Sequence, residues 1–324
     1  MDWQELVWPI VQQTLHKAGD VDGVILATTK GDIAKQVAWM RALDAGHAQP
    51  SEPPTLGATL AELMNASGLT RKPGWIVSTA CSSGLVALID AAIAVQQGEM
   101  QRVLVVAADV SDSFMEQGFA ALKALSATGV CRPFDRHRDG LMLGAAAAAC
   151  IVSPLTDRSI CELRSFGISN DATHMTAPDR EARGLIRAIQ QTLARASLTP
   201  NDIDALFLHG TGTRYNDAME ATALRQVFSP AGHTPAVTAV KGLIGHTLGT
   251  SGLVEALLAA QMIAEQTIPG IIGLEDPEYP DIAPVRPHES PPAPPPRRPI
   301  RHILKTASGF GGMNAAVLLS KVTE

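Results

Sequence analysis

Apolar and polar residues alternate in blocks along the chain, and the period within each block predicts its secondary structure. Apolar positions recur with a helical period at 3–18, 32–44, 56–66, 82–97, 179–196, 217–227 and 250–265. Short apolar runs bounded by glycine, proline or polar residues predict strands at 22–28, 74–79, 103–108, 142–152, 161–168, 204–208, 235–239, 301–307 and 314–319. Because helices fall between buried strands, we expect an α/β fold whose sheets are covered on both faces.

Two of the predicted helices resemble each other. The segment SSGLVALIDAAIAVQQGE at 82–99 is similar to TSGLVEALLAAQMIAEQT at 250–267, and each copy follows a strand and a turn of small residues. Two unrelated helices rich in alanine and leucine would share this composition, but the common Ser-Gly-Leu-Val opening favours a duplication. We expect two halves, residues 1–153 and 154–324, packed about a pseudo-dyad that brings both helix starts to one centre.

Composition narrows the class of protein. Hydrophobic residues make up 46% of the 324 positions and charged residues 18%, so much of the chain should be buried. The net charge of −6 argues against nucleic acid or an anionic membrane as a partner. No apolar run is long enough to span a bilayer, and the first residues lack the pattern of a signal peptide. We therefore expect a soluble, cytoplasmic protein.

The four cysteines, Cys81, Cys131, Cys150 and Cys161, show no spacing typical of a metal site. We expect them to be reduced thiols, and we expect no bound metal. The segment PVRPHESPPAPPPRRP at 284–299 is rich in proline and predicts an exposed, extended loop. A polyproline ligand for a partner is the alternative interpretation of that segment.

One cysteine occupies a position suited to chemistry. Cys81 lies in VSTACSSGLVAL, between the predicted strand at 74–79 and the predicted helix at 82–97. The positive end of a helix and its unpaired N–H groups favour a thiolate and can hold an oxyanion. A small buried apolar cysteine is the other interpretation, and this segment alone does not separate the two.

Two histidines occupy similar turns after strands. His209 is followed by Gly-Thr-Gly-Thr in LFLHGTGTRYNDAMEA, and His246 follows Lys241 in AVKGLIGHTLGTSG. Glycines there let a substrate approach the backbone, and the hydroxyl groups can bind it. The glycine-rich segment KTASGFGGMNAAVLL at 305–319 is not a dinucleotide fingerprint, because no helix follows it.

These motifs together resemble the β-ketoacyl synthases of the thiolase fold, and in particular their elongating branch. The matching stretches are TACSSG (79–84), RPFDRHRDGLMLG (132–144), SNDATHMTAPD (169–179), HGTGTRYNDAMEA (209–221), KGLIGHTLGTSG (241–252) and GFGG (309–312). The resemblance extends from about residue 20 to the end of the chain. It implies a duplicated, layered α-β-α-β-α fold with two pseudo-symmetric halves.

The resemblance also implies a role for each matching residue. The expected catalytic residues are Cys81 as the acyl-accepting nucleophile, His209 and His246 at the malonyl thioester carbonyl, and Lys241 as the group that orients them. The expected gating residues are Phe310, whose N–H joins that of Cys81 in the oxyanion hole, and Asp171 and His174 in a second gate loop. Thr211 and Thr213 are expected to contact the phosphopantetheine arm.

The implied reaction is the decarboxylative Claisen condensation of acyl and malonyl thioesters on an acyl carrier protein, in fatty acid or polyketide-type synthesis. The protein would need no cofactor of its own, since 4'-phosphopantetheine arrives on the carrier. Basic residues such as Arg214 and Lys123 would face the acidic carrier near the tunnel mouth, or would be solvated surface charges. Thiolases use a second cysteine near the C-terminus, and initiating synthases carry Asn in place of His246, so both fit less well.

Some positions depart from the family pattern. Synthases of this branch begin with a strand, a helix and a long loop before the region that matches residues 1–20, and we expect this segment to be missing. Arg214, Thr306 and Met313 replace the usual proline, asparagine and threonine. These differences motivate an alternative function, a non-condensing partner subunit similar to a chain-length factor. We also expect a homodimer or heterodimer, paired across a two-fold axis through the strand at 102–108.

Overall fold

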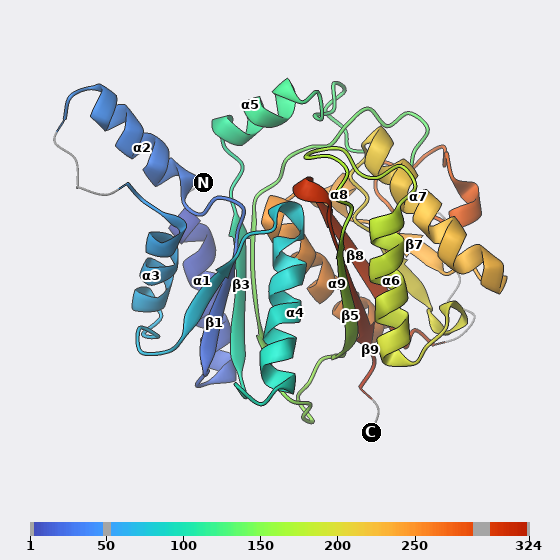
Figure 1. The fold of residues 1–324 in the computed structure, drawn as a ribbon, viewed down its shortest axis with the longest axis horizontal. Helices are drawn as coiled ribbons and strands as arrows, with labels where there is room; N and C mark the ends of the chain where they lie inside the picture. The colour runs from blue at the N-terminus through green and yellow to red at the C-terminus, as the bar shows by residue number, and fades with distance from the viewer. Residues whose placement is uncertain (1–2, 48–52, 288–298, 323–324) are drawn as a thin grey trace.

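The computed structural model describes residues 3–47, 53–287 and 299–322, which form two β-sheets separated and flanked by helices (Figure 1). The strand order is β2-β1-β3-β4 in the first sheet and β5-β9-β8-β6-β7 in the second. Most of the predicted proline-rich loop, residues 288–298, lies outside the described residues. No helix of the described ranges is long and apolar enough to cross a membrane.

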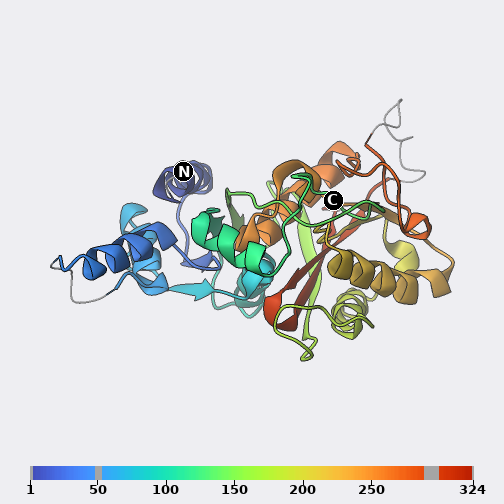
Figure 2. The same cartoon turned by 90° about the horizontal axis from the view of Figure 1, so that it is seen from above.

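The first sheet and its helices come from the N-terminal part of the chain. The elements are α1 (Trp3–Ala18), β1 (Gly23–Ala27), α2 (Ile33–Asp44), α3 (Leu56–Ala66), β2 (Gly74–Val77), α4 (Ser83–Gln96), β3 (Val103–Asp109), α5 (Ser113–Ala121) and β4 (Ala146–Val152). Strand β1 pairs in parallel with β2 on one side and β3 on the other, whereas β4 runs antiparallel to β3. In Figure 2 this half lies beside the C-terminal half, with α2 and α3 at its outer end.

The second sheet comes from the C-terminal part. The elements are β5 (Glu162–Asn170), α6 (Arg183–Ala196), β6 (Ala205–Phe207), α7 (Arg214–Phe228), β7 (Ala236–Thr238), α8 (Lys241–Ile244), α9 (Ser251–Glu265), β8 (His302–Gly309) and β9 (Met313–Ser320). Strands β8, β6 and β7 are parallel, and β9 lies antiparallel between β5 and β8.

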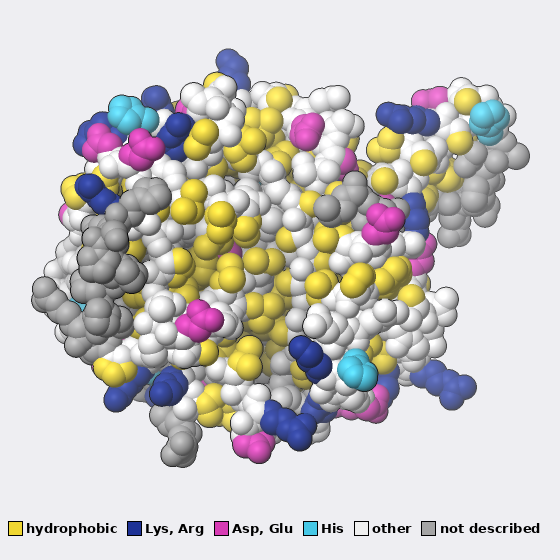
Figure 3. Space-filling view, turned by 180° about the vertical axis from the view of Figure 1, so that it is seen from behind, with side chains coloured by type: hydrophobic (Ala, Val, Ile, Leu, Met, Phe, Trp, Pro, Cys, Tyr) yellow, Lys and Arg dark blue, Asp and Glu magenta, His cyan; other side chains and the backbone are white. Residues whose placement is uncertain are grey.

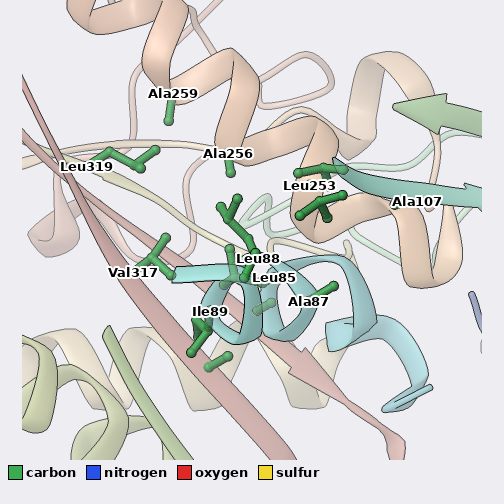
Figure 4. Packing of buried hydrophobic residues seen from close by; sticks show 14 of the residues in the cluster. Leu85, Ala87, Leu88, Ile89, Ala107, Leu253, Ala256, Ala259, Val317 and Leu319 are labelled. Atoms are coloured by element: carbon green, nitrogen blue, oxygen red, sulfur yellow. The ribbon is translucent and has the colours of Figure 1, made fainter. Parts of the chain in front are cut away.

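Helices α4 and α9 form the middle layer between the two sheets. Their apolar side chains share one buried cluster with inward-facing residues of both sheets, such as Ala107 of β3 and Val317 of β9 (Figure 4). Helices α1 and α3 cover the outer face of the first sheet, and α6 and α7 cover that of the second. The layers therefore follow the order α-β-α-β-α, which confirms the predicted fold class.

The predicted repeat is visible in the backbone. Ala80 and Leu248 both have a left-handed conformation, with φ of 53° and 54°, and each begins a 3-10 turn that leads into α4 or α9. The two helices then cross at a pair of glycines. A Cβ on Gly84 would lie 2.8 Å from the Gly249 carbonyl oxygen, and one on Gly252 would lie 2.5 Å from the Leu85 nitrogen. The duplicated segments thus meet at the centre of the molecule, as the repeat predicts.

Some sequence predictions differ from the structure. The predicted strand at 142–152 begins only at Ala146, because residues 142–144 pair instead with the segment at His246, to which Leu143 forms an isolated parallel bridge. Helices α5 and α8 were not predicted, since α5 buries a single apolar side chain and α8 has four residues. The prediction that strand 102–108 forms the dimer edge is wrong: β3 is paired on both sides, and the edges of its sheet are β2 and β4.

Candidate active site

Cys81 lies in a tight turn between β2 and α4. The left-handed Ala80 reverses the chain, and the turn is fixed by hydroxyl groups: Ser83 Oγ donates to the Ala80 carbonyl at 2.5 Å, and the Thr79 N–H donates to Ser83 Oγ at 2.9 Å. Only 6% of Cys81 is exposed. A left-handed alanine costs about 1 kcal/mol relative to a helical conformation, so the surrounding packing must hold this turn.

The Cys81 thiol is neutral at physiological pH. Burial raises its pKa to about 12, although the positive charge of Lys241 and the backbone N–H groups of Cys81 and Phe310 act in the opposite direction. The sequence interpretation expected the helix start to favour the thiolate; in the closed pocket, desolvation outweighs that effect. The two N–H groups nevertheless point at the sulfur, so they are positioned for an oxyanion formed there.

The two histidine rings lie together. The ring centroids of His209 and His246 are 5.2 Å apart, with the planes at 86°. Burial, followed by the charge of Lys241, lowers the pKa of both imidazoles well below 6.5, so both are neutral. The Leu248 N–H donates to Nδ1 of His246 at 3.1 Å, which makes Nε2 the protonated nitrogen of that ring.

A buried network of charges holds His209. Lys241 Nζ donates to the His209 carbonyl at 2.6 Å, lies 3.3 Å from His209 Nδ1, and pairs with Glu255 Oε1 at 2.5 Å. Lys305 pairs with the other Glu255 oxygen at 2.7 Å. The backbone N–H groups of His209 and Gly210 donate to the two oxygens of Glu220, both at 2.7 Å. With Lys241 as donor to Nδ1, the proton of His209 also lies on Nε2.

Cys81, His209 and His246 line one pocket of about 520 Å³. Its walls include Thr211 and Thr213, whose hydroxyl groups lie 2.9 Å apart. The structure therefore brings Cys81, the two imidazoles and the predicted pantetheine contacts to one cavity formed by both halves of the chain. Lys241 lies behind His209 and does not line this cavity.

The predicted gate residues fall into two linked loops. Phe310 is 36% exposed and stacks on Phe119 of α5, with ring centroids 5.7 Å apart. Asp171 accepts the Asn314 side-chain amide at 2.8 Å and the Asp179 N–H at 3.0 Å, so it ties the second loop to β9. His174 is exposed, does not line the pocket, and accepts two backbone N–H groups of its own loop.

Sequence reasoning missed Glu255 and Lys305, which complete the charge network behind His209. A signal was present: each is a lone charge in an apolar run, Glu255 within SGLVEALLAA and Lys305 within HILKTA. A charge is buried at such a place only when a partner of opposite sign meets it. The partner lies on another element, so the sequence does not reveal which residue it is.

Two sequence models match the chain: Beta-ketoacyl synthase, N-terminal domain, at residues 12–158, and Beta-ketoacyl synthase, C-terminal domain, at residues 160–275. The 3-oxoacyl-[acyl-carrier-protein] synthase 2 of Coxiella burnetii is 31% identical over 264 residues, which are 78% of this chain and 63% of that protein. The tetracenomycin polyketide synthase ketoacyl synthase alpha subunit of Streptomyces glaucescens is 31% identical over 267 residues, 78% of this chain and 61% of that one.

Solved structures of ketosynthases resemble this chain along almost its whole length. The ishigamide ketosynthase/chain length factor has a TM-score of 0.83 at 26% identity, covering 96% of this chain and 78% of that one. The ketosynthase ApeO in complex with its chain length factor ApeC, from Xenorhabdus doucetiae, has a TM-score of 0.79 at 27% identity, covering 97% and 78%. This chain spans less than two thirds of the length of the curated relatives described above. The match of both domain models and the layered fold together show that the chain belongs to the β-ketoacyl synthase family.

Proposed function

We propose that this chain joins acyl and malonyl thioesters carried on an acyl carrier protein, by decarboxylative Claisen condensation in fatty acid or polyketide-type synthesis. One observation carries the proposal: Cys81 shares a pocket with two neutral imidazoles, His209 and His246. The name of the Coxiella relative, a 3-oxoacyl-[acyl-carrier-protein] synthase, supports the same substrate class.

The first step moves the acyl group to the enzyme. The sulfur of Cys81 attacks the thioester carbonyl, forms a new carbon–sulfur bond, and displaces the thiol of the phosphopantetheine arm, which takes up the proton that Cys81 loses. The negative oxygen of the intermediate accepts from the N–H groups of Cys81 and Phe310. Because the resting thiol is neutral, attack and deprotonation have to be coupled.

The second step makes the new carbon–carbon bond. A malonyl thioester loses CO₂ and leaves an enolate, whose oxygen accepts from Nε2–H of His209 and His246. Neutral imidazoles suit this task, since they donate hydrogen bonds without protonating the carbanion. The carbanion attacks the Cys81 thioester, a 3-oxoacyl thioester leaves on the carrier, and the released sulfur takes one proton from solvent.

The carrier protein and its arm are part of the proposal. The arm would pass Thr211 and Thr213, whose hydroxyl groups line the pocket, and would bring 4'-phosphopantetheine as the only prosthetic group required. Lys123 and Arg214 also line this pocket and suit the docking of an acidic protein. A cytoplasmic location remains our prediction, since all four cysteines are free thiols.

A second candidate function is that of a chain-length-factor-like subunit that binds a full-length synthase without condensing. One observation favours it: a solved relative is a ketosynthase in complex with its chain length factor. A complete set of Cys81, His209 and His246 favours the condensing enzyme. For assembly we now propose the free edge of β2, which directly precedes Cys81.

Acylation of Cys81 tests the proposal directly. After incubation with an acyl-carrier protein, mass spectrometry should find the acyl mass on the peptide containing Cys81, and Cys81→Ala should abolish it. With malonyl-carrier protein added, His209→Ala or His246→Ala should lower CO₂ release by about 10²- to 10³-fold, as for the loss of one oxyanion donor, while acylation persists. A folded chain that is never acylated, yet binds a full-length synthase on size-exclusion chromatography, would establish the second candidate.

A further inference from the structure

A second pocket lies beside the active-site pocket, along the first turns of α7. It has a volume of about 550 Å³, and its walls carry one acidic residue, Glu278, and four arginines, Arg136, Arg138, Arg180 and Arg214. We call it the arginine pocket. Arg214 and Tyr215 line both pockets, so the two meet at the start of α7. Figure 3 shows a face on which Lys and Arg side chains are spread around the rim rather than gathered at the centre. In a chain of net charge −6, four arginines in one pocket are a local concentration of positive charge.

Two of the four arginines are already paired with carboxylates. Arg136 Nε pairs with Asp276 Oδ2 at 2.9 Å. The Arg138 guanidinium pairs with Glu278, and its Nε lies 3.7 Å from Asp217 Oδ2. These ion pairs hold one wall of the arginine pocket in place, and they leave little net charge there for a ligand.

The other two arginines, Arg180 and Arg214, form no ion pair with any residue that the structure describes, and both are exposed. The Arg180 guanidinium lies 6.0 Å from the ring centroid of Tyr215, the residue next to Arg214. Two guanidinium groups that share a pocket without a carboxylate of their own repel each other, and a bound anion offsets that repulsion. Arginine binds phosphate through parallel hydrogen bonds, so a phosphate group fits this pair.

The position of Arg214 relates the arginine pocket to the active site. Arg214 directly follows Thr213, an expected contact of the pantetheine arm, and it is exposed, whereas Cys81 is buried. A pantetheine arm with its thioester at Cys81 would therefore have its phosphate end on the side of Arg214. Arg214 replaces the proline usual in the family, so this charge belongs to the present chain rather than to the family pattern.

Size and charge distinguish two possible donors of the acyl group. A carrier protein attaches the arm through a phosphodiester, which stays at the surface of that protein. Coenzyme A instead ends the arm in a diphosphate, a 3'-phosphate and an adenine ring. The unpaired Arg180 and Arg214 suit several phosphate charges, and a pocket of about 550 Å³ has the size of a small-molecule site. Tyr215, which is 65% exposed, offers an aromatic surface for adenine.

We propose that the arginine pocket binds the 3'-phosphoadenosine diphosphate end of coenzyme A, so that this chain accepts acyl groups from coenzyme A thioesters. The inference rests on the proposed function, because the acyl acceptor is Cys81. The Cys81 sulfur forms a bond to the acyl carbon, and the bond from that carbon to the coenzyme A sulfur breaks. The released coenzyme A thiol takes up the proton that Cys81 loses.

Adenosine 3',5'-bisphosphate tests the pocket without any reaction. Isothermal titration calorimetry on the full chain should show saturable binding with a Kd below about 1 mM. Arg180→Ala and Arg214→Ala replace exposed side chains, so both variants should fold, and each should weaken binding at least about tenfold. Arg187→Ala removes an exposed arginine of α6 outside the pocket and is the matched control, with an unchanged Kd. No saturable binding, or binding that neither pocket variant weakens, overturns the inference.

A comparison of acyl donors tests the link to the reaction. At equal low concentration, acyl-coenzyme A should acylate Cys81 at least about tenfold faster than acyl-pantetheine, which lacks the phosphates and the nucleotide, and Arg180→Ala should reduce this preference. If acyl-carrier protein acylates Cys81 but acyl-coenzyme A reacts no faster than acyl-pantetheine, the inference is overturned and the proposed function stands. If the bisphosphate binds through Arg180 but no donor acylates Cys81, the proposed function fails and the nucleotide site stands.

Discussion

At the scale of single residues, the site depends on groups whose charge is set by burial. His209 and His246 stay neutral because they are buried and lie near the positive charge of Lys241. The Cys81 thiol stays protonated because it is buried. The positive charge near the histidines is balanced by Glu255, which pairs with both buried lysines. Burial therefore keeps both imidazoles neutral, at some expense of stability in acid.

The loss of folding stability in acid can be measured. The pKa of His246 is lower in the folded chain than the value of about 6.5 expected after unfolding, so below pH 6.5 the unfolded state binds more protons and the native state loses stability. His246→Asn removes one such group. Between pH 6.5 and the folded pKa, the unfolding free energy of the parent should fall relative to the variant by up to about 1.4 kcal/mol per pH unit in urea titrations. Parallel pH profiles for the two proteins would contradict this assignment.

At the scale of elements, the crossing of α4 and α9 fixes the distance between Cys81 and the imidazoles. Helix α4 begins just after the turn that carries Cys81, and α9 begins just after the segment that carries His246. Each helix presents a glycine, Gly84 or Gly252, to the backbone of the other. Such a contact leaves no room for a methyl group, so the two turns are held in register by backbone packing. Strand β8 adds a third constraint, because a Cβ on Gly309 would lie 3.0 Å from the Thr79 carbonyl oxygen.

A single methyl group should therefore disturb both stability and activity. Gly252→Ala places a Cβ against the Leu85 backbone and should cost about 1–3 kcal/mol in chemical unfolding, with a loss of Cys81 acylation in the folded fraction. Gly118→Ala in α5 is the matched control, since a Cβ there meets no atom within 4 Å. Higher helix propensity should stabilise that variant by up to about 1 kcal/mol. Equal effects of the two substitutions would exclude the packing explanation.

At the scale of the whole molecule, the described residues add no further strand at either edge of the first sheet, β2 or β4. In the second sheet the edge strands are β5 and β7, and β7 is bridged to residues 283–285 through Val237. The candidate site is lined by residues of both halves. Unpaired backbone groups at β2 and β4 are available for pairing with other chains. Of these two edges, β2 is the one proposed above for assembly with a second synthase subunit.

This assignment predicts different protection at the two edges. On dilution from an oligomer to a monomer, hydrogen exchange should accelerate in Gly74–Val77, while exchange in residues 146–152 should stay unchanged. Size-exclusion chromatography coupled to light scattering would define the oligomer at each concentration. A reversed pattern, with protection confined to 146–152, would show that β4 is the assembly edge instead.

Much of the fold and of the candidate site could be predicted from local sequence. Apolar periods located the strands and every α-helix of the described residues except α5 and α8, and the shared Ser-Gly-Leu-Val segments indicated the duplicated centre. The boundary between the halves at 153 and 154 stays a prediction, as do the catalytic roles carried over from the family. The dimer edge was predicted wrongly, because an apolar run such as β3 reads the same whether it is central in a sheet or at its edge.

The sequence by itself determined the family, the turns that carry Cys81, His209 and His246, and the type of each long element, because these depend on residue identity and short-range spacing. Only the tertiary structure decided that the Cys81 thiol is neutral, that Glu255 joins Lys241 to Lys305, and that β4 lies beside an open groove. Desolvation, charge pairing and strand order arise from contacts between residues distant in sequence, and no local pattern specifies them.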